Sequence, residues 1–191
     1  MAIEEPMYTI KEQERNLEIR DYPALVAAEV SVCGERFAAA TSGFRLLAAY
    51  IFGGNQRRQQ INMTAPVIQS QATEELIPMT APVIQTAPGE NQWMIRFMMP
   101  SLYSLDTLPT PDDQRVHLIT LPPTRFAVIR FPGLAKERDI KNKTSELYAF
   151  IAYHHLSFSG SPTLARYNPP WTLWFMRRNE IMIQVQDEAI G

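Results

Sequence analysis

The sequence lacks the features that define several common functional classes. Cys33 is its only cysteine, so no intrachain disulfide can form, and one cysteine with three histidines lacks the paired spacing of a structural zinc site. We interpret Cys33 as a small buried hydrophobe. A net charge of −2 without any basic block gives no support to a nucleic-acid partner.

Membrane and export signals are also missing. No run approaches the roughly 18 apolar residues of a membrane-spanning helix, and the start of the chain carries Glu4 and Glu5 where a signal peptide has basic residues. We therefore expect a cytoplasmic protein that does not use a membrane as partner. The apolar share of 46% and the charged share of 20% are ordinary for a soluble globular domain.

Motifs for nucleophilic catalysis and for phosphate binding are absent as well. The sequence contains no G-x-S-x-G, no G-x-G-x-x-G and no G-x-x-x-x-G-K-[ST]. The acidic pairs at 74–75 and 112–113 lie in polar stretches, which do not raise a carboxyl pKa as an apolar surrounding would. These absences favour a binding protein over an enzyme.

What the chain does have is a repeated nonamer. Residues 61–69 read INMTAPVIQ, and residues 77–85 read IPMTAPVIQ, sixteen residues later. Each copy alternates as a strand does, but each contains a proline, which belongs on a sheet edge, at a bulge or beside a cavity. The two copies are either edge-like strands of an antiparallel sheet or strands that rim a ligand pocket.

Two stretches have the period of a helix. In 35–52 the apolar residues fall on one helical face, and Gly53 ends the pattern; a second helix is predicted over 136–153. The first helix is unusual because alanines also occupy its other side, so that few charges are left to solvate it. Either core packing or a bound apolar ligand covers that side.

The order of elements predicts the fold class. Strands, a helix and further strands occur twice, with a proline-rich joint at 101–115. This order is typical of an α+β protein, a distorted antiparallel β-barrel or sheet with two long helices. We expect residues 1–191 to form a single domain made of two pseudo-repeat halves, about 17–100 and 115–187.

Several residue types suit a flat ligand that bears carboxylates. Methionines such as Met63 are soft and fill irregular gaps, and Trp171 and Trp174 lie close to Arg177, whose guanidinium can bind a carboxylate through two hydrogen bonds. The alternative is that Arg177 or Arg178 pairs with Glu180 while the tryptophans fill the core. His154-His155 ends the second helix, where a cation interacts well with the last carbonyls; the other reading is a metal or haem ligand.

Three segments together resemble the SOUL/haem-binding protein family in its bacterial form. They are the doubled MTAPV, the helix end AYIFGGN at 49–55, and ARYNPPWTLWFMRRNE at 165–180. The resemblance covers nearly the whole chain. It implies a distorted β-barrel flanked by two helices, related to GyrI-like small-molecule-binding domains.

The resemblance also implies a shallow apolar site for haem or another tetrapyrrole, between the first helix, at Phe44 and Ala48, and the loop 169–174. The family's proposed propionate-binding basic residues correspond here to Thr41, Ala49 and Thr172, and its proposed axial histidine has no counterpart. We expect the missing cations to be replaced by arginines and the iron to meet Tyr50 or a methionine only weakly. The candidate cations are Arg45, Arg57, Arg58 and Arg177.

Two functions stay open from the sequence. The first is a non-catalytic carrier or buffer of haem, or of a related porphyrin, with no clear axial ligand. The second is a GyrI-like hydrolase or a tetrapyrrole-modifying enzyme, which needs a carboxylate in its pocket. Only Glu29, Glu35 and Glu180 lie near the relevant elements.

Overall fold

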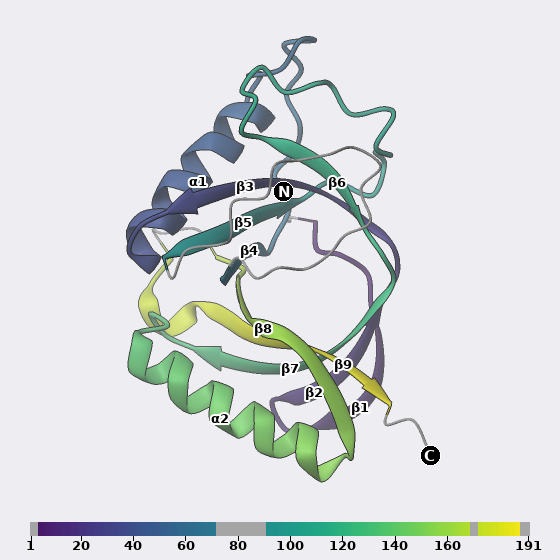
Figure 1. The fold of residues 1–191 in the computed structure, drawn as a ribbon, viewed down its shortest axis with the longest axis vertical. Helices are drawn as coiled ribbons and strands as arrows, with labels where there is room; N and C mark the ends of the chain where they lie inside the picture. Colours follow the sequence, from purple (N-terminus) through teal and green to yellow (C-terminus); the bar gives the residue numbers. More distant parts are fainter. Residues whose placement is uncertain (1–3, 72–90, 169–171, 188–191) are drawn as a thin grey trace.

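A computed structural model describes residues 4–71, 91–168 and 172–187. Its strands and helices alternate much as the sequence predicts (Figure 1). The elements are β1 (Thr9–Glu14), β2 (Leu17–Tyr22), β3 (Leu25–Cys33), α1 (Arg36–Ile51), β4 (Val67–Gln71), β5 (Gln92–Met98), β6 (His117–Leu121), β7 (Thr124–Pro132), α2 (Glu137–Tyr153), β8 (Leu156–Arg166), the 3₁₀ turn η1 (Trp174–Met176) and β9 (Arg178–Asp187).

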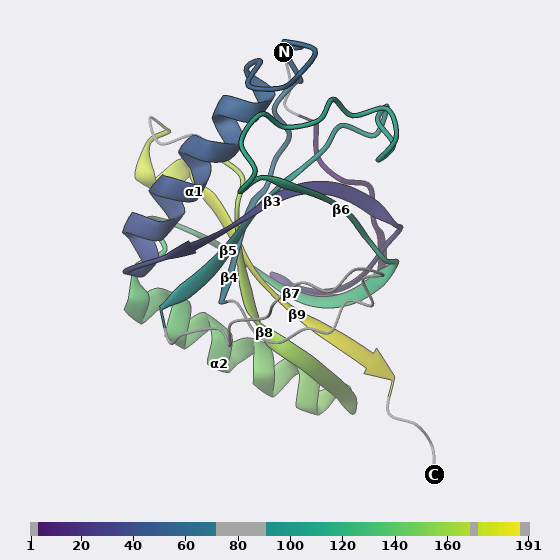
Figure 2. The same cartoon turned by 45° about the horizontal axis from the view of Figure 1, so that its top comes forward.

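All nine of these strands join one antiparallel sheet, in the order β1-β2-β7-β9-β8-β4-β5-β3-β6. The sheet is strongly curved, so that β3 and β6 face β7 and β9 across its inner side (Figure 2). β4 and β8 pair at its centre and join a half built mainly from the first part of the chain to a half built mainly from the second. The α+β class with two helices is therefore confirmed.

The sheet order also shows how the two halves exchange strands. Outward from the central pair, one side reads β4-β5-β3-β6 and the other reads β8-β9-β7-β2-β1. β2 therefore pairs with β7 as well as with its sequence neighbour β1, and β6 pairs with β3, away from the strands that neighbour it in sequence. This arrangement suits the expected repeat, whose boundaries at 17–100 and 115–187 stay a prediction.

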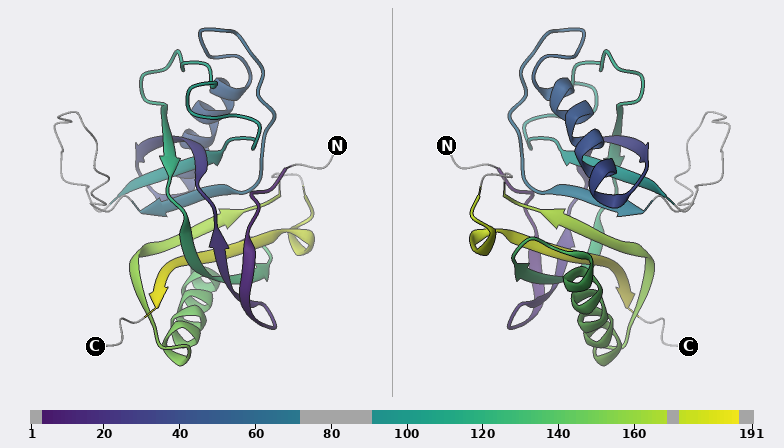
Figure 3. Two further views of the ribbon diagram at one scale, coloured as in Figure 1. Left: turned by 90° about the vertical axis from the view of Figure 1, so that its right-hand side faces the viewer. Right: turned by 90° about the vertical axis from the view of Figure 1, so that its left-hand side faces the viewer.

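Both helices lie on the outer face of the sheet, α1 over β3 and β5 and α2 over β7, β8 and β9 (Figure 3). Their bounds agree with the predicted 35–52 and 136–153. The side chain of Glu35 caps α1 by accepting hydrogen bonds from the backbone N–H groups of Phe37 and Ala38. At Gly43 a side chain would collide with Ile95, so glycine lets α1 lie close to β5.

The curved sheet creates three apolar clusters, one beneath each helix and one on the inner face. Leu47 is at the centre of the cluster under α1, and Leu147 has the same place under α2. The inner cluster contains Tyr22, Met98 and Tyr167. Both faces of the sheet bury apolar residues. The helices cover the outer face, and because the sheet is curved, its two halves cover the inner face of each other, which stabilises the curvature.

Several local predictions need correction. The first copy of the nonamer forms a strand only from Val67, since 61–66 is irregular, with an isolated bridge at Thr64 and a cis Ala65–Pro66 peptide; the second copy lies outside the described residues. The polar residues before Leu17, for which the sequence predicts no element, contain the strand β1, whose six residues are all exposed. The sequence pattern indicates a short strand over 163–167, and the structure shows that it is the end of an eleven-residue strand, β8 (Leu156–Arg166). Cys33 is exposed rather than buried, because it ends β3 at the sheet margin.

No helix of the described chain is long and apolar enough to cross a membrane.

Candidate ligand-binding surface

The solvent side of α1 is a smooth surface made of small side chains. The helix has only two charged residues, Arg36 and Arg45. Its exposed positions are Phe37, Ala38, Thr41, Ser42, Arg45 and Ala49, and the capping residue Phe52 at its end is 66% exposed. The described residues that contact α1 belong chiefly to β3 and β5, beneath it. The apolar side that the sequence predicts is therefore open to solvent.

The four α1 residues predicted to bind the ligand have different environments. Arg45 is exposed, and Ala48 is half-buried at the edge of the smooth surface. Phe44 is also half-buried, and its ring packs edge-on against Phe97 of β5 with 5.3 Å between centroids. Phe44 therefore supports the helix on the sheet, and only part of it can contact a ligand.

Tyr50 is 1% exposed and faces the sheet. Its hydroxyl donates to the carbonyl of Pro109 at 2.9 Å, and burial, together with the nearby Tyr103, raises its pKa to about 12. Ligation of iron by tyrosine needs a reachable and readily deprotonated phenol. We therefore leave Tyr50 out of the proposed surface.

The residues predicted from the segment after α1 are spread out. Arg57 and Arg58 are exposed in the turn that follows the helix, and Arg57 donates to the carbonyl of Thr107 at 3.3 Å. Met63 is half-buried against the cluster under α1. These three residues lie beyond the C-terminal end of α1, so they do not extend the smooth surface sideways.

The late loop between β8 and β9 exposes a second apolar surface. Trp174 is 61% exposed, and its neighbours Leu173, Phe175 and Met176 are exposed to a similar degree. The interpretation of Trp174 as a core residue is therefore wrong, whereas the pairing of Arg178 with Glu180 is confirmed at 2.9 Å. Trp171 lies outside the described residues. Arg177 is half-buried, and its Nε donates to the carbonyl of Thr172 at 2.9 Å.

The structure does not bring α1 and the late loop together as one pocket. The chief contacts of α1 are with β3 and β5, while η1 contacts β7. In the right-hand view of Figure 3 the yellow segment around η1 stands to one side of both helices. The two predicted parts of the site are thus separate surfaces, linked through the end of β8.

Sequence reasoning missed the residue at that link. Arg166, the last residue of β8, lies 5.5 Å from the ring centroid of Phe37 at the start of α1. Its Nη2 atom is shielded from solvent and has no hydrogen-bond partner in the described part of the chain, and the same is true of Oε1 of Gln69. The sequence carries no signal for this missing partner, because it depends on the three-dimensional positions of the acidic residues relative to Arg166.

The three carboxylates considered for catalysis all have partners. Glu35 caps α1, and Glu29 accepts a hydrogen bond from Arg96 Nε at 2.7 Å. Glu180 is fully buried and forms two hydrogen bonds with Arg20, at 2.8 and 3.1 Å.

Glu180 is held further by Tyr167, which donates to it at 2.7 Å, and by Arg178. Burial alone would raise the pKa of Glu180, but the hydrogen bonds and charge of Arg20, with Tyr167 and Arg178, outweigh it and lower the pKa. A general base near neutral pH needs the opposite shift and a free oxygen. Glu180 is therefore a structural anion.

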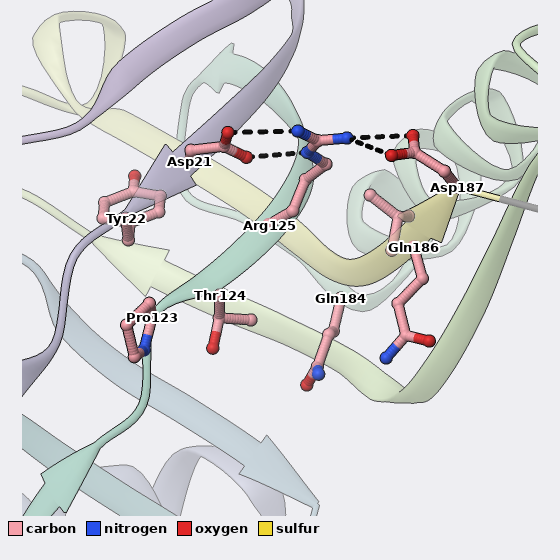
Figure 4. A pocket seen from close by; sticks show the side chains of 9 residues that line it. Asp21, Tyr22, Pro123, Thr124, Arg125, Gln184, Gln186 and Asp187 are labelled. Atoms are coloured by element: carbon pink, nitrogen blue, oxygen red, sulfur yellow. Dashed lines mark hydrogen bonds and ion pairs between the residues drawn. The ribbon is translucent and has the colours of Figure 1, made fainter.

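Two cavities lie away from α1. One, of about 420 Å³, is polar and open, lined by the ends of β2, β7 and β9 (Figure 4). Arg125 stands at its rim, and its guanidinium is held between Asp21 and Asp187. The other, of about 190 Å³, lies where residues 4–7 meet Pro23–Val26 and 98–101. Each lining has one aromatic residue, Tyr22 in the first and Tyr103 in the second, which is less aromatic surface than a flat porphyrin would cover.

Iron ligands are sparse among the described residues, where no group of three His, Cys, Asp or Glu side chains could hold a metal ion. His154 caps α2 and lies 3.0 Å from a carboxylate oxygen of Glu14, as expected of a helix-terminal histidine. His117 and His155 are exposed elsewhere, so no histidine lies on α1 or in the described part of the late loop. Met176, which is 63% exposed in the late loop, carries a thioether, one of the side-chain types that bind haem iron.

Comparison with known proteins agrees with this architecture. The model of the SOUL heme-binding protein family matches residues 3–184, and the chain belongs to this family. Heme-binding protein 1 of Xenopus tropicalis is 27% identical over 175 residues, covering 85% of this chain and 84% of that protein.

Solved structures extend the likeness at the level of the fold. The EcmrR C-terminal domain matches with a TM-score of 0.64 at 9% identity, covering 95% of this chain and 99% of that one. A hydrolase from Listeria innocua matches with a TM-score of 0.60 at 11% identity, covering 92% and 94%. Such low identities show a shared fold and carry no activity to this chain.

Proposed function

We propose that this protein binds haem or a related tetrapyrrole reversibly, without catalysing a reaction on it, and acts as a carrier or buffer. The observation that carries the proposal is the solvent side of α1, which is smooth, nearly uncharged and uncovered within the described chain. A porphyrin is a flat apolar molecule, and burial of apolar surface contributes about 25 cal/mol per Å². Membership of the SOUL heme-binding family supports the same ligand class.

The residues suited to each part of the ligand can be assigned from their exposure. Ala38, Thr41, Ser42 and Ala49 would lie under the ring, because their short side chains let a flat molecule approach the helix backbone. Arg45 would face a carboxylate from the same surface. The late loop, with Trp174 and Met176, is a further apolar surface that a ligand at the start of α1 can approach.

A non-catalytic role is supported by the state of the candidate carboxylates. Glu29, Glu35 and Glu180 are each engaged by an arginine or by a helix N-terminus, and none is left free to move a proton. The hydrolase alternative draws on fold likeness alone.

The test is an absorbance titration of the purified protein with haemin. We expect a saturable change with one haemin per chain, and without a strong low-spin bis-histidine spectrum, because the histidines lie away from α1 and from the described late loop. A linear, non-saturable response would contradict the proposal. A sharp low-spin spectrum that is lost in His154→Ala would show that the ligand binds at the end of α2 instead.

A further inference from the structure

Arg166 is a half-buried cation that lacks an anionic partner in the described chain. Its Nη2 atom is closed to solvent and makes no hydrogen bond there, and none of the ion pairs among the described residues includes it. Arg20, by contrast, is fully buried and is held by Glu18 and Glu180. Shielding a guanidinium N–H from water without a hydrogen-bond partner costs free energy. The shielded, unpaired Nη2 of Arg166 therefore indicates a place for an anion.

The position of Arg166 follows from the pairing of β4 with β8. Val67 pairs with Arg166, and Gln69 pairs with Leu164, so all four side chains share one face of the sheet. Leu164 belongs to the cluster under α2, and Val67 packs against the cluster under α1. Arg166 and Gln69 therefore lie on the outer face, where the two helices begin.

Gln69 is a second incomplete partner at the same place. It is 3% exposed, and its Nε2 donates to the carbonyl of Arg36 at 2.8 Å, while its Oε1 has no partner in the described chain. Nη2 of Arg166 lacks an acceptor, which a ligand group between the strands and the start of α1 would supply, whereas Oε1 of Gln69 lacks a donor and would not bind an anionic group itself.

The charges around Arg166 are mainly positive. Burial lowers its pKa, and the charges of Arg36 and Arg177 lower it further. Two acids lie at the helix starts, but Glu137 binds Arg36 Nε at 2.6 Å, and Glu35 caps α1. The start of α1 adds the positive end of a helix dipole. Arg36, Arg166, Arg177 and the start of α1 would all favour an anion at this place, and the two acids nearby are already engaged.

We propose that Arg166, with Arg36 and Arg177 around it, is the receptor for a carboxylate of the ligand that binds on α1. The inference rests on the proposed function and adds the group that fixes the ligand's orientation. Phe37 links the two, since its ring lies over Arg166 and its exposed side begins the smooth surface of α1. A carboxylate held by Arg166 would leave the apolar ring to extend along the helix.

The test compares haemin with its dimethyl ester, which keeps the ring and iron but lacks the carboxylate charges. Both are titrated into the wild type, Arg166→Gln and the control Arg138→Gln, which removes an equal charge from the exposed side of α2. We expect the wild type and the control to bind haemin about tenfold more tightly than the ester. Arg166→Gln should lose most of this preference, with an unchanged affinity for the ester.

The outcomes separate the receptor from porphyrin binding itself. If the wild type binds acid and ester equally, or if Arg166→Gln keeps the preference, the receptor is wrong while porphyrin binding stands. If neither porphyrin binds, the proposed function fails, and sodium propionate becomes the probe. A rise in Tm with propionate over matched sodium chloride, present in wild type and Arg138→Gln but absent in Arg166→Gln, would support the receptor. No such rise would overturn it.

Discussion

The two long helices play the same part in the fold but present different surfaces to solvent. Each covers one half of the curved sheet and buries a leucine fully, Leu47 in α1 and Leu147 in α2. α2 carries six charged residues, as a solvated helix does, whereas α1 carries two. Packing against the sheet requires only the buried face. The missing charges of α1 are the reason why we propose its outer face as the binding surface.

The largest predicted effect is a loss of stability, and it should be equal for the two helices. Leu47→Ala and Leu147→Ala each remove a fully buried side chain from the centre of a cluster, and each should lower the free energy of unfolding by about 2–5 kcal/mol. Urea unfolding followed by circular dichroism measures both. If one substitution cost much less than the other, the two helices would not support the sheet equally, and the comparison would lose its basis.

The next largest predicted effect is on haemin affinity, and it should differ between the two helices. Ala49 and Ala149 are both exposed, one on each helix. Ala49→Asp places a charge under the ligand ring, where burial without a partner costs about 1–3 kcal/mol, so haemin should bind about tenfold or more weakly. Ala149→Asp should leave haemin affinity unchanged. Equal affinities in both variants would move the binding surface away from α1.

The helix starts should respond in opposite directions. Glu35→Ala removes the side-chain cap of α1 and should lower stability by about 1 kcal/mol. The N-cap of α2 is Lys136, which makes no capping hydrogen bond, so Lys136→Ser should raise stability by about 0.5–1 kcal/mol. Thermal unfolding of the ligand-free variants checks both signs. A loss of stability in Lys136→Ser would show that the lysine has another structural role.

The smallest effect concerns the late loop. Trp174 is 61% exposed, so Trp174→Ala should change stability by less than about 0.5 kcal/mol. The loop ends at Arg177, which is close enough to Arg166 to lower its pKa, so it adjoins the proposed carboxylate end of the ligand. We expect haemin to bind roughly threefold more weakly, since most of the ring stays solvated. An effect as large as that of Ala49→Asp would make the loop the main surface.

Much of the fold could be predicted because its helices have a clear period. The bounds of α1 and α2 follow from apolar spacing and from the glycines after residue 52. β1 was missed because its six residues are all exposed, so they carry no alternation to detect. Most of β8 was missed because 157–161 is rich in serine and exposes its one large apolar residue, Phe158, so that pairing with β9 is what holds it as a strand.

The candidate site was predictable only in part. The alanines of α1 show in the sequence that the side of the helix away from its apolar face has few charges, and the structure shows that this side is exposed. The arginine network was harder, because Arg20 and Glu180 lie 160 residues apart and meet only through β2, β7 and β9. The lack of an acidic partner for Arg166 in the described chain depends on the three-dimensional positions of the acids, which local sequence patterns do not encode. Long-range pairing thus decides which arginines are held in ion pairs, such as Arg20, and this could not be predicted from local sequence patterns.

The most direct test of the central claim is a chemical-shift map of the ¹⁵N-labelled protein titrated with iron-free protoporphyrin, which is diamagnetic. Binding on the outer side of α1 predicts that the amides of residues 37–49 shift together, saturably, while those of residues 138–149 on α2 stay unchanged. Shifts that gather on α2 or around the polar cavity at Arg125, with α1 unaffected, would contradict the account.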